Sequence, residues 1–461
     1  MQSKLSFFGG AGAVTGSNFL LEDSPSQGLG AVNTRVLIDC GLYQSQHSCE
    51  ETNWSAFPYV PKSITALVVT HAHIDHIGKI PRLVKEGFAG PIYSTEATKA
   101  IAGPMLGDAL ELLAREAERC GKLPMFGAED ITSAIGLWKG LPYHQTFTIG
   151  DYSVEFLNSG HILGSAQAHI TRGGKKIVFT GDLGGGNSPL LPPCEPPDSP
   201  DYLVTESVYG DRTRRDEDRR ERLENVIEDA AARGGVLLIP AFSTERTQDL
   251  LFEIGSLMRE RRVPPMPVFA DSPLAQQITE AYLQYPQYFD GEVRRRVESG
   301  ENIFSFPELK FVHDARESAA ILKTPGPKIV IAGSGMSNGG RVLAHEMKIL
   351  PDPKATLLIV GYQAAGSLGR RLLEGQKKVK VQNVEVEVKC AVEAIFGYSA
   401  HMDAEELLEF ANKASDGGKL KEVFVVMGEP AASAMLSQRI RDYLGVRATV
   451  PEAGESATIE L

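Results

Sequence analysis

Several features that would place a chain in a special class are missing from this sequence of 461 residues. No apolar run is long enough to cross a bilayer. Residues 1–21 are mildly apolar, but they lack a basic leader and are interrupted by Gly9-Gly10-Ala11-Gly12. We therefore predict no membrane span, no membrane partner and no signal peptide, but a first strand followed by a tight turn.

Cysteine is scarce and shows no pairing pattern. The five cysteines are odd in number and include no Cys-x-x-Cys spacing. A disulfide framework typically has an even number of cysteines, and many cysteine metal sites use that short spacing. We therefore predict that all five are reduced thiols in a cytoplasmic protein.

Positive charge is not in excess. The chain has 47 Lys and Arg against 59 Asp and Glu, a net charge of −12. This balance argues against a broadly basic surface that coats nucleic acid, but it leaves room for a local basic groove. The length predicts two or three domains. Composition alone therefore leaves the partner open.

Histidine is also scarce, yet three of the ten histidines stand in Thr70-His71-Ala72-His73-Ile74-Asp75-His76. A β-branched apolar run at residues 64–69 precedes this motif, and apolar residues at helical spacing follow it. The polar side chains therefore lie on a strand-to-helix turn, where they can point into one cleft. Imidazole with carboxylate suits Zn²⁺ or a similar divalent metal. The alternative is a chance cluster on a solvated turn.

The predicted elements change in character along the chain. Residues 1–206 contain mostly short apolar strands separated by turn residues. Between residues 236 and 360, strands alternate with helices, which indicates a parallel sheet covered by helices. Residues 384–450 return to strands and helices, and we predict the last strand at 448–450. This order favours an α/β protein of more than one domain.

The metal motif, followed by His161 and then Asp182, resembles the metallo-β-lactamase superfamily. The resemblance implies a four-layer αβ/βα sandwich with two stacked sheets. It implies that His71, His73 and His161 hold a first metal. It also implies that Asp75 and His76 hold a second metal and that Asp182 bridges both.

Asp39 follows a predicted strand and resembles an aspartate that orients ligands in that superfamily. From the sequence alone, Asp39 is equally well read as a turn former at a strand end. Both readings stay open at this point.

Further stretches resemble the β-CASP family, a nucleic-acid-processing branch of the superfamily. They are Thr205–Gly210, Pro240–Gln248, Asp271–Ala275, Ser334–Arg341 and Tyr398–Asp403. The resemblance implies a metallo-β-lactamase domain at residues 1–207 and 386–461, with an inserted β-CASP α/β domain at 208–385.

The same resemblance implies the activity. We expect a zinc-dependent ribonuclease that hydrolyses phosphodiester bonds of single-stranded RNA by a metal-activated hydroxide. Cleavage would be endonucleolytic, with exonuclease action in addition. Two Zn²⁺ per chain, Mn²⁺ as a substitute metal and a homodimer are implied on the same ground.

Asp75, Glu206 and His401 are the predicted catalytic residues. On the resemblance, His401 contacts the scissile phosphate or protonates the leaving oxygen, and Glu206 orients it. Ser399 is a predicted phosphate contact beside His401. Taken alone, His401 would be read as a surface residue next to a helix cap.

The stretch Ser334-Gly335-Met336-Ser337 follows a predicted strand and precedes a helix that begins near Arg341. Backbone N–H groups in such a loop can cradle a substrate phosphate. Four arginines that would each be read alone as solvated helix residues are candidates to line a groove for the RNA backbone: Arg246, Arg341, Arg370 and Arg371. Few aromatic residues lie near them in the sequence, so we predict no stacking on bases.

Met427 departs from the family pattern, which has a histidine at this position before Gly-Glu. A thioether is a poor substitute for imidazole on Zn²⁺, so the second metal site is predicted to be weak. Met427 alternatively packs as core. A catalytically impaired RNA-binding or scaffold protein therefore stays open beside the ribonuclease. A small-molecule hydrolase of the wider superfamily is a third reading, which the inserted domain disfavours.

Overall fold

The computed structural model of the chain describes residues 2–23, 33–44, 49–213, 218–361, 363 and 366–461. The chain divides into two compact units. Unit 1 comprises residues 1–186, 193–213 and 401–461, and unit 2 comprises residues 187–192 and 214–400. All predicted metal ligands lie in unit 1, and the predicted phosphate loop lies in unit 2.

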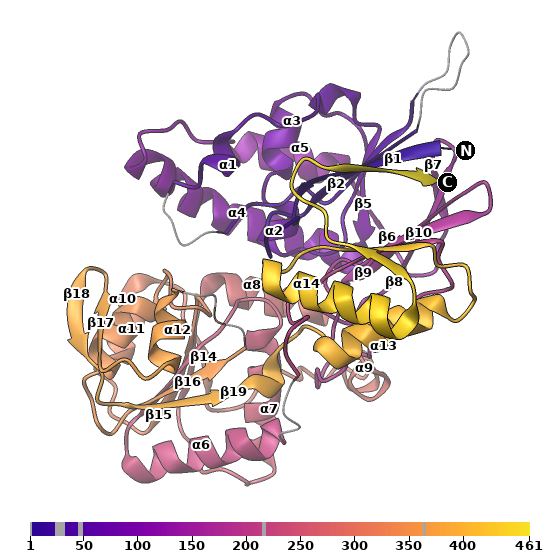
Figure 1. Cartoon of the computed structure of the whole chain (residues 1–461). Helices are drawn as coiled ribbons and strands as arrows, with labels where there is room; N and C mark the ends of the chain where they lie inside the picture. Colours follow the sequence, from indigo (N-terminus) through magenta and orange to yellow (C-terminus); the bar gives the residue numbers. More distant parts are fainter. Residues whose placement is uncertain (1, 24–32, 45–48, 214–217, 362, 364–365) are drawn as a thin grey trace. The chain divides into compact units, whose positions relative to one another are not determined.

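Within the described residues, unit 1 holds two seven-stranded sheets (Figure 1). The first sheet has the spatial order β22 (Ser456–Glu460), β1 (Gln2–Gly9), β2 (Asn18–Asp23), β3 (Arg35–Ile38), β4 (Ala66–Val68), β5 (Ile92–Thr95) and β6 (Trp138–Leu141). The second has the order β21 (Arg447–Thr449), β20 (Glu422–Val425), β11 (Tyr202–Thr205), β10 (Lys175–Phe179), β9 (Ala166–Arg172), β8 (Tyr152–Asn158) and β7 (Phe147–Ile149).

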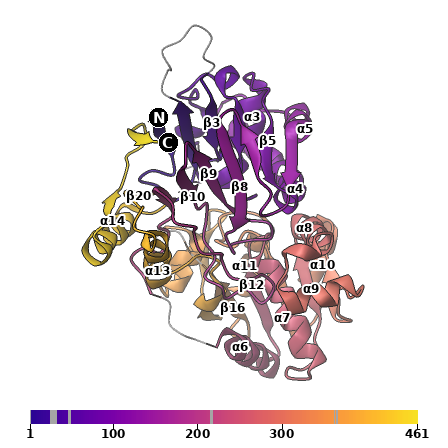
Figure 2. The same cartoon turned by 90° about the vertical axis from the view of Figure 1, so that its right-hand side faces the viewer.

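Apolar residues from both sheets form one core between them. Phe7 and Phe19 of the first sheet share a buried cluster with Phe156 and Phe179 of the second. The outer faces are covered by helices, and Figure 2 shows α13 and α14 beside β10 and β20. The described helices of unit 1 are α1 (Glu51–Trp54), α2 (Ile74–Ile77), α3 (Ile80–Lys85), α4 (Glu96–Arg119), α5 (Ala128–Leu137), α13 (Ala404–Ser415) and α14 (Pro430–Arg439). The predicted αβ/βα sandwich is therefore confirmed.

Unit 2 is built on a six-stranded sheet in which every pairing is parallel. Its spatial order is β14 (Leu309–Phe311), β13 (Val268–Asp271), β15 (Lys328–Ala332), β12 (Val236–Pro240), β16 (Thr356–Val360) and β19 (Ala391–Ile395). The described helices are α6 (Arg219–Arg233), α7 (Arg246–Arg259), α8 (Pro273–Leu283), α9 (Gly291–Glu298), α10 (Ala315–Ile321), α11 (Val342–Ile349) and α12 (Leu368–Leu373). A hairpin, β17 (Lys378–Val381) and β18 (Val384–Glu387), completes the unit. The strand–helix alternation read from the sequence is what a parallel sheet requires, because its strands need crossover connections.

One strand near the carboxyl end of the chain lies where the sequence interpretation does not place it. The strand at 448–450 is not the last, because β22 follows and pairs antiparallel with β1. The domain boundary at residue 385 stays a prediction; β19, which follows it, pairs with β16 in the sheet of unit 2.

The prediction of five reduced thiols is wrong for one pair. Cys49 and Cys120 form a disulfide with a Cα–Cα distance of 5.7 Å, within the range that such a bond spans. Cys40, Cys194 and Cys390 are free thiols. The disulfide joins positions 71 residues apart, a proximity that cysteine spacing does not show.

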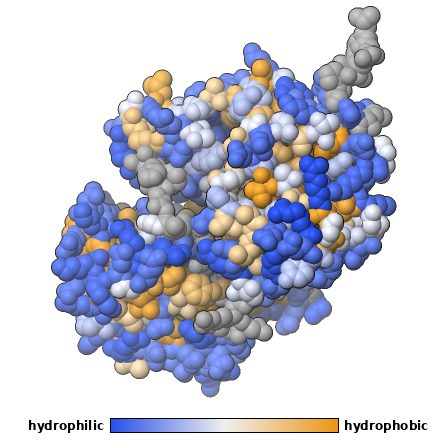
Figure 3. Space-filling view, in the orientation of Figure 1, coloured by the Kyte–Doolittle hydropathy of each residue, from blue (hydrophilic) through white to orange (hydrophobic). Residues whose placement is uncertain are grey.

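The outer surface of the chain is mostly polar on the face shown in Figure 3, where hydrophobic residues form small groups among hydrophilic ones. Exposed apolar side chains such as Leu123 and Tyr443 are ordinary features of a protein surface. Across the described residues, no helix has both the length and the hydrophobicity that a membrane span needs.

Candidate metal centre

The candidate ligands lie in loops that follow strands of both sheets of unit 1. His71 and His73 lie between β4 and α2, and Asp75 and His76 lie within the single turn of α2. His161 lies in the connection between β8 and β9, and Asp182 follows β10. The two sheets are tied together here, because the backbone N–H of Ala166 donates to the carbonyl of Thr70. The predicted strand-to-helix turn is thus present and faces the second sheet.

Four of the predicted ligands converge on one point. His73 Nδ1 lies 3.1 Å from His71 Nε2 and 3.1 Å from His161 Nε2. Asp182 Oδ2 lies 3.5 Å from His71 Nε2 and 3.4 Å from His161 Nε2. Ligands of a tetrahedral metal at about 2.0–2.1 Å are separated from one another by about 3.3–3.4 Å. The spacing therefore fits a divalent metal, and three imidazole nitrogens facing one another cannot all be satisfied by mutual hydrogen bonds.

Asp39 and Thr70 hold the Nδ1 atoms of His71 and His76, so that the Nε2 atoms of these two rings face the cluster. Asp39 Oδ2 accepts hydrogen bonds from Thr70 Oγ1 at 2.9 Å and from His76 Nδ1 at 2.7 Å. Since Thr70 Oγ1 donates to Asp39, it accepts from His71 Nδ1 at 3.2 Å. Both Nε2 atoms are then left without a proton in the neutral imidazoles, which is the form that binds a metal. Asp39 is therefore more than a turn former.

A second half of the centre is built around His76. His76 Nε2 is buried and has no hydrogen-bond partner among the described residues. It lies 3.4 Å from Asp182 Oδ1 and 4.0 Å from Asp75 Oδ2. Asp182 Oδ2 thus faces His71 and His161, and Asp182 Oδ1 faces His76. An orphaned imidazole nitrogen between two carboxylates fits a second divalent metal bridged by Asp182.

The electrostatics of His71 and Asp182 agree with metal binding, whereas burial raises the pKa of Asp75 to about 6 and the carboxylates of Asp182 and Asp39 outweigh burial to raise the pKa of His76 well above its ordinary value. Burial lowers the pKa of His71 well below its ordinary value, and the neighbouring His76 lowers it further. Burial alone would raise the pKa of Asp182, but the facing His76 and His71 bring it well below its usual range. Neutral imidazole and ionised carboxylate are the protonation states that ligate a metal.

Met427 follows β20 by two residues and is buried among the residues between the two sheets. Its backbone N–H donates to the carbonyl of Gly10, and its φ of 49° is in the left-handed region. Packing in the core is thus observed for this side chain, and its effect on a second metal stays a prediction.

Two residues that the sequence interpretation missed support the ligand turn. A Cβ on Gly41 would lie 1.5 Å from the carbonyl oxygen of Asp75, so only glycine allows this approach. Ser17 donates through Oγ to Asp39 Oδ2, and its backbone N–H donates to the Asp75 carbonyl. The Gly-rich segment after β1 and the Asp-Cys-Gly sequence after β3 were the available signals, but neither shows its partner.

His401 and Glu206 form a pair beside the metal cluster. Glu206 is fully buried, and its Oε1 accepts from His401 Nδ1 at 3.1 Å and from the backbone N–H of Leu183 at 2.6 Å. The ring centroid of His401 lies 4.7 Å from that of His161. Burial lowers the pKa of His401, but the carboxylates of Glu206, Asp182 and Asp75 together more than offset this, so the net direction is upward. The predicted catalytic pair is thus brought together at the cluster.

The predicted phosphate loop follows β15 in unit 2. The backbone N–H of Ser334 donates to Gly339, and that of Ser337 donates to Ser334. Within the described part of the chain, the N–H groups of Gly335 and Met336 have no acceptor. Two of the four predicted residues therefore present backbone donors that a phosphate can use. The other predicted phosphate contact, Ser399, is buried after the short helical turn that follows β19.

Ser337 has a structural partner instead. Its hydroxyl donates to the buried carboxyl group of Glu346 on α11. Burial raises the pKa of Glu346 to about 7. This contact ties the Ser337 end of the loop to α11.

Two of the four candidate groove arginines bind carboxylates within unit 2. Arg246 is buried and contacts Asp249 Oδ2 at 2.7 Å. Arg341 contacts Asp271 Oδ1 at 2.7 Å and donates to the carbonyl of His313 at 3.0 Å. Both therefore stabilise the unit, and their predicted role as free phosphate contacts is not supported. Arg370 and Arg371 lie on α12, where Arg370 pairs with Glu374.

Three family models match consecutive parts of the chain. The metallo-beta-lactamase superfamily model matches residues 30–224. The Beta-Casp domain model matches residues 247–372, and the model described as Zn-dependent metallo-hydrolase RNA specificity domain matches residues 385–451. The candidate ligands up to Asp182 fall in the first match, and His401 falls in the third.

Similar proteins are found over nearly the full length. Ribonuclease TTHA0252 of Thermus thermophilus is 36% identical, with 87% of this chain and 89% of that protein covered. Transcription termination factor FttA of Methanosarcina mazei is 30% identical, with 96% of this chain and 69% of that protein covered. A crystal structure of a protein of unknown function from Enterococcus faecalis V583 has a TM-score of 0.55 at 14% identity, covers 100% of both chains and shows likeness of fold.

Proposed function

The chain belongs to the β-CASP family of the metallo-β-lactamase superfamily, and from this premise we propose that it is a metal-dependent ribonuclease acting on single-stranded RNA. The observation that carries the proposal is the convergence of His71, His73, His161 and Asp182 beside the His401–Glu206 pair. The ribonuclease name of a relative with 36% identity and the match to an RNA specificity domain support RNA as the substrate.

The ligand set supports two metals per chain, which we propose to be Zn²⁺, with Mn²⁺ as a substitute. His71, His73 and His161 would hold the first ion, Asp75 and His76 the second, and Asp182 would bridge them. When bound, such ions polarise phosphoryl oxygens and lower the pKa of a coordinated water. Asp39 and Thr70 would keep His71 and His76 in the tautomers that ligate through Nε2.

His401 and Glu206 supply the proton chemistry in this proposal. The Glu206 carboxylate accepts the Nδ1 proton of His401, so the imidazole acts on the substrate through Nε2. The charge of Glu206 favours the imidazolium, which can donate a hydrogen bond to the scissile phosphate and a proton to the leaving oxygen. The backbone donors of Gly335 and Met336 would hold another phosphate of the strand. We propose endonucleolytic cleavage with exonuclease action in addition, while a homodimer and a cytoplasmic location stay predictions.

Cleavage of an end-labelled single-stranded RNA tests the function directly. We expect cleavage with Zn²⁺ or Mn²⁺, loss of cleavage after chelation, and recovery when metal is added back, with metal content measured on the same sample. A single-stranded DNA of the same sequence, a β-lactam and a thioester serve as comparison substrates. Hydrolysis of a small molecule without RNA cleavage would favour the wider superfamily, and the absence of RNA cleavage with all metals would refute the proposal.

Met427 favours a second candidate, a protein that binds RNA with a weakened second metal site. Met427→His is expected to add metal to the second site and to raise the cleavage rate, because imidazole is a stronger Zn²⁺ ligand than a thioether. The left-handed φ of 49° is compatible with histidine, which visits this region more than most residues. Metal stoichiometry and single-turnover rate are the measurements, with Met427→Leu as the control for a change in packing. Unchanged stoichiometry and rate would show that the second site does not depend on this position.

A further inference from the structure

Phe242 is an exposed aromatic residue at the carboxyl edge of the unit 2 sheet. It follows β12 by two residues, and 36% of its surface is exposed, although large aromatic side chains are usually highly buried. The neighbouring strand β15 ends in the loop that contains Gly335 and Met336. In parallel α/β sheets, ligands bind outside the carboxyl ends of the strands. Phe242 therefore stands where this fold places ligands.

The ring of Phe242 lies against the phosphate loop. A Cβ on Gly335 would be 2.8 Å from Phe242 Cδ2 and 2.9 Å from its backbone nitrogen, so the absence of a side chain at 335 is required for this contact. The backbone of Phe242 is held by α7, because its carbonyl accepts from Thr247 Oγ1 at 2.8 Å. One side of the ring is thus supported by the loop, and the backbone beneath it is tied to α7.

Two kinds of binding group are therefore adjacent in unit 2: an exposed ring and the unpaired backbone N–H groups of Gly335 and Met336. The N–H groups suit a phosphate, and the ring suits the face of a base. We propose that Phe242 stacks on a nucleobase of the bound RNA, next to a phosphate held by this loop. The proposal rests on the ribonuclease function and departs from the sequence-based expectation that no base is stacked, which no observation here tests.

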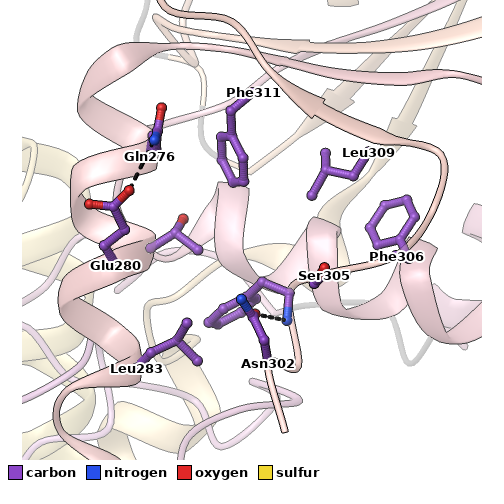
Figure 4. A pocket seen from close by; sticks show the side chains of 10 residues that line it. Gln276, Glu280, Leu283, Asn302, Ser305, Phe306, Leu309 and Phe311 are labelled. Atoms are coloured by element: carbon purple, nitrogen blue, oxygen red, sulfur yellow. Dashed lines mark hydrogen bonds between the residues drawn. The ribbon is translucent and has the colours of Figure 1, made fainter.

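The chemistry of a second aromatic surface in unit 2 makes it a poorer site for RNA. A pocket of about 260 Å³ lies between α8 and residues 302–311. Figure 4 shows Phe311 and Leu309 pointing into it and the hydrogen-bonded pair Gln276 and Glu280 on its rim. The Glu280 carboxylate repels phosphate, and no arginine or lysine lines the pocket. Phe311 is therefore an aromatic ring like that of Phe242, but its pocket has no basic side chain to bind a phosphate.

The test compares Phe242→Ala with Phe311→Ala in the full chain. Phe242→Ala is expected to raise KM for single-stranded RNA about 5- to 140-fold, the range for losing one base–aromatic stack, with kcat nearly unchanged. Phe242→Trp should restore KM, since indole also stacks. Phe311→Ala should leave KM unchanged, and thermal unfolding of all three variants controls for folding.

An abasic competitor distinguishes stacking from a general loss of structure. A strand of the same length without bases should inhibit the wild type and Phe242→Ala with equal Ki, and the salt dependence of KM should be the same for both, because the ring carries no charge. If the wild type cleaves RNA and Phe242→Ala keeps its KM, the stacking proposal is wrong and the ribonuclease function stands. If the wild type cleaves no RNA, both are overturned.

Discussion

His401→Ala is expected to lower kcat for RNA cleavage by about 10²- to 10⁴-fold, the usual contribution of a general acid or base. The reason is the geometry of the pair: Glu206, fully buried and held by two backbone N–H groups, orients His401 through Nδ1. Because we propose His401 for proton transfer and not as a ligand of either metal, the metal content should stay that of the wild type; the alternative is that His401 holds a metal together with Asp182 and Glu206. Steady-state cleavage and metal analysis of the same preparation measure both quantities.

His144→Ala is the matched control for this loss of an imidazole. His144 lies on the surface of unit 1 and contacts Glu195 at 3.2 Å. Its removal should change neither kcat nor metal content. Metal loss in His401→Ala would instead make His401 a ligand, and a kcat close to the wild-type value would remove it from the catalytic machinery.

The metal centre could be predicted from the sequence because its core is local. Four candidate ligands stand within six positions, and a strand-to-helix turn is enough to bring them together. The distant ligands His161 and Asp182 were identified through resemblance to a family. No local pattern shows that the β8–β9 connection and the end of β10 meet the turn across two sheets.

The supporting contacts were much less predictable. The sequence leaves the role of Asp39 open, because the alternatives differ only in whether Thr70 and His76 reach its carboxylate. Contacts of this kind join parallel strands that are far apart in the sequence. The same reason explains the Cys49–Cys120 disulfide and the pairing of β22 with β1, which link distant positions through the packed fold.

For the arginines, the sequence suggested a functional contact where the structure shows an internal one. Arg246 and Arg341 were candidates for phosphate contact because charge is visible in a sequence, whereas burial is not. In the structure, each meets a buried carboxylate, Asp249 or Asp271, and a buried charge needs such a partner. The exposure of Phe242 is likewise invisible in the sequence, since an aromatic residue after a strand is ordinarily read as core.

His161→Ala is expected to remove the first metal and to lower RNA cleavage by about 10³-fold or more, since a bound metal contributes several kcal/mol to the transition state. His161 is the one ligand of this cluster that comes from the β8–β9 connection, so no neighbouring residue on the same turn can replace it. Cleavage rate and metal stoichiometry should fall together, and excess Zn²⁺ should restore little activity.

His169→Ala separates this loss from the loss of any buried imidazole. His169 is buried on β9 in the same unit, and burial lowers its pKa to about 3, so a neutral ring is lost in this variant. Its Nε2 lies 3.2 Å from Gln167 Oε1, and the ring does not face the metal cluster. His169→Ala should therefore lower thermal stability while keeping metal and activity. If His161→Ala kept its metal, or if His169→Ala lost as much, the first metal would not depend on the convergence of ligands from the two sheets.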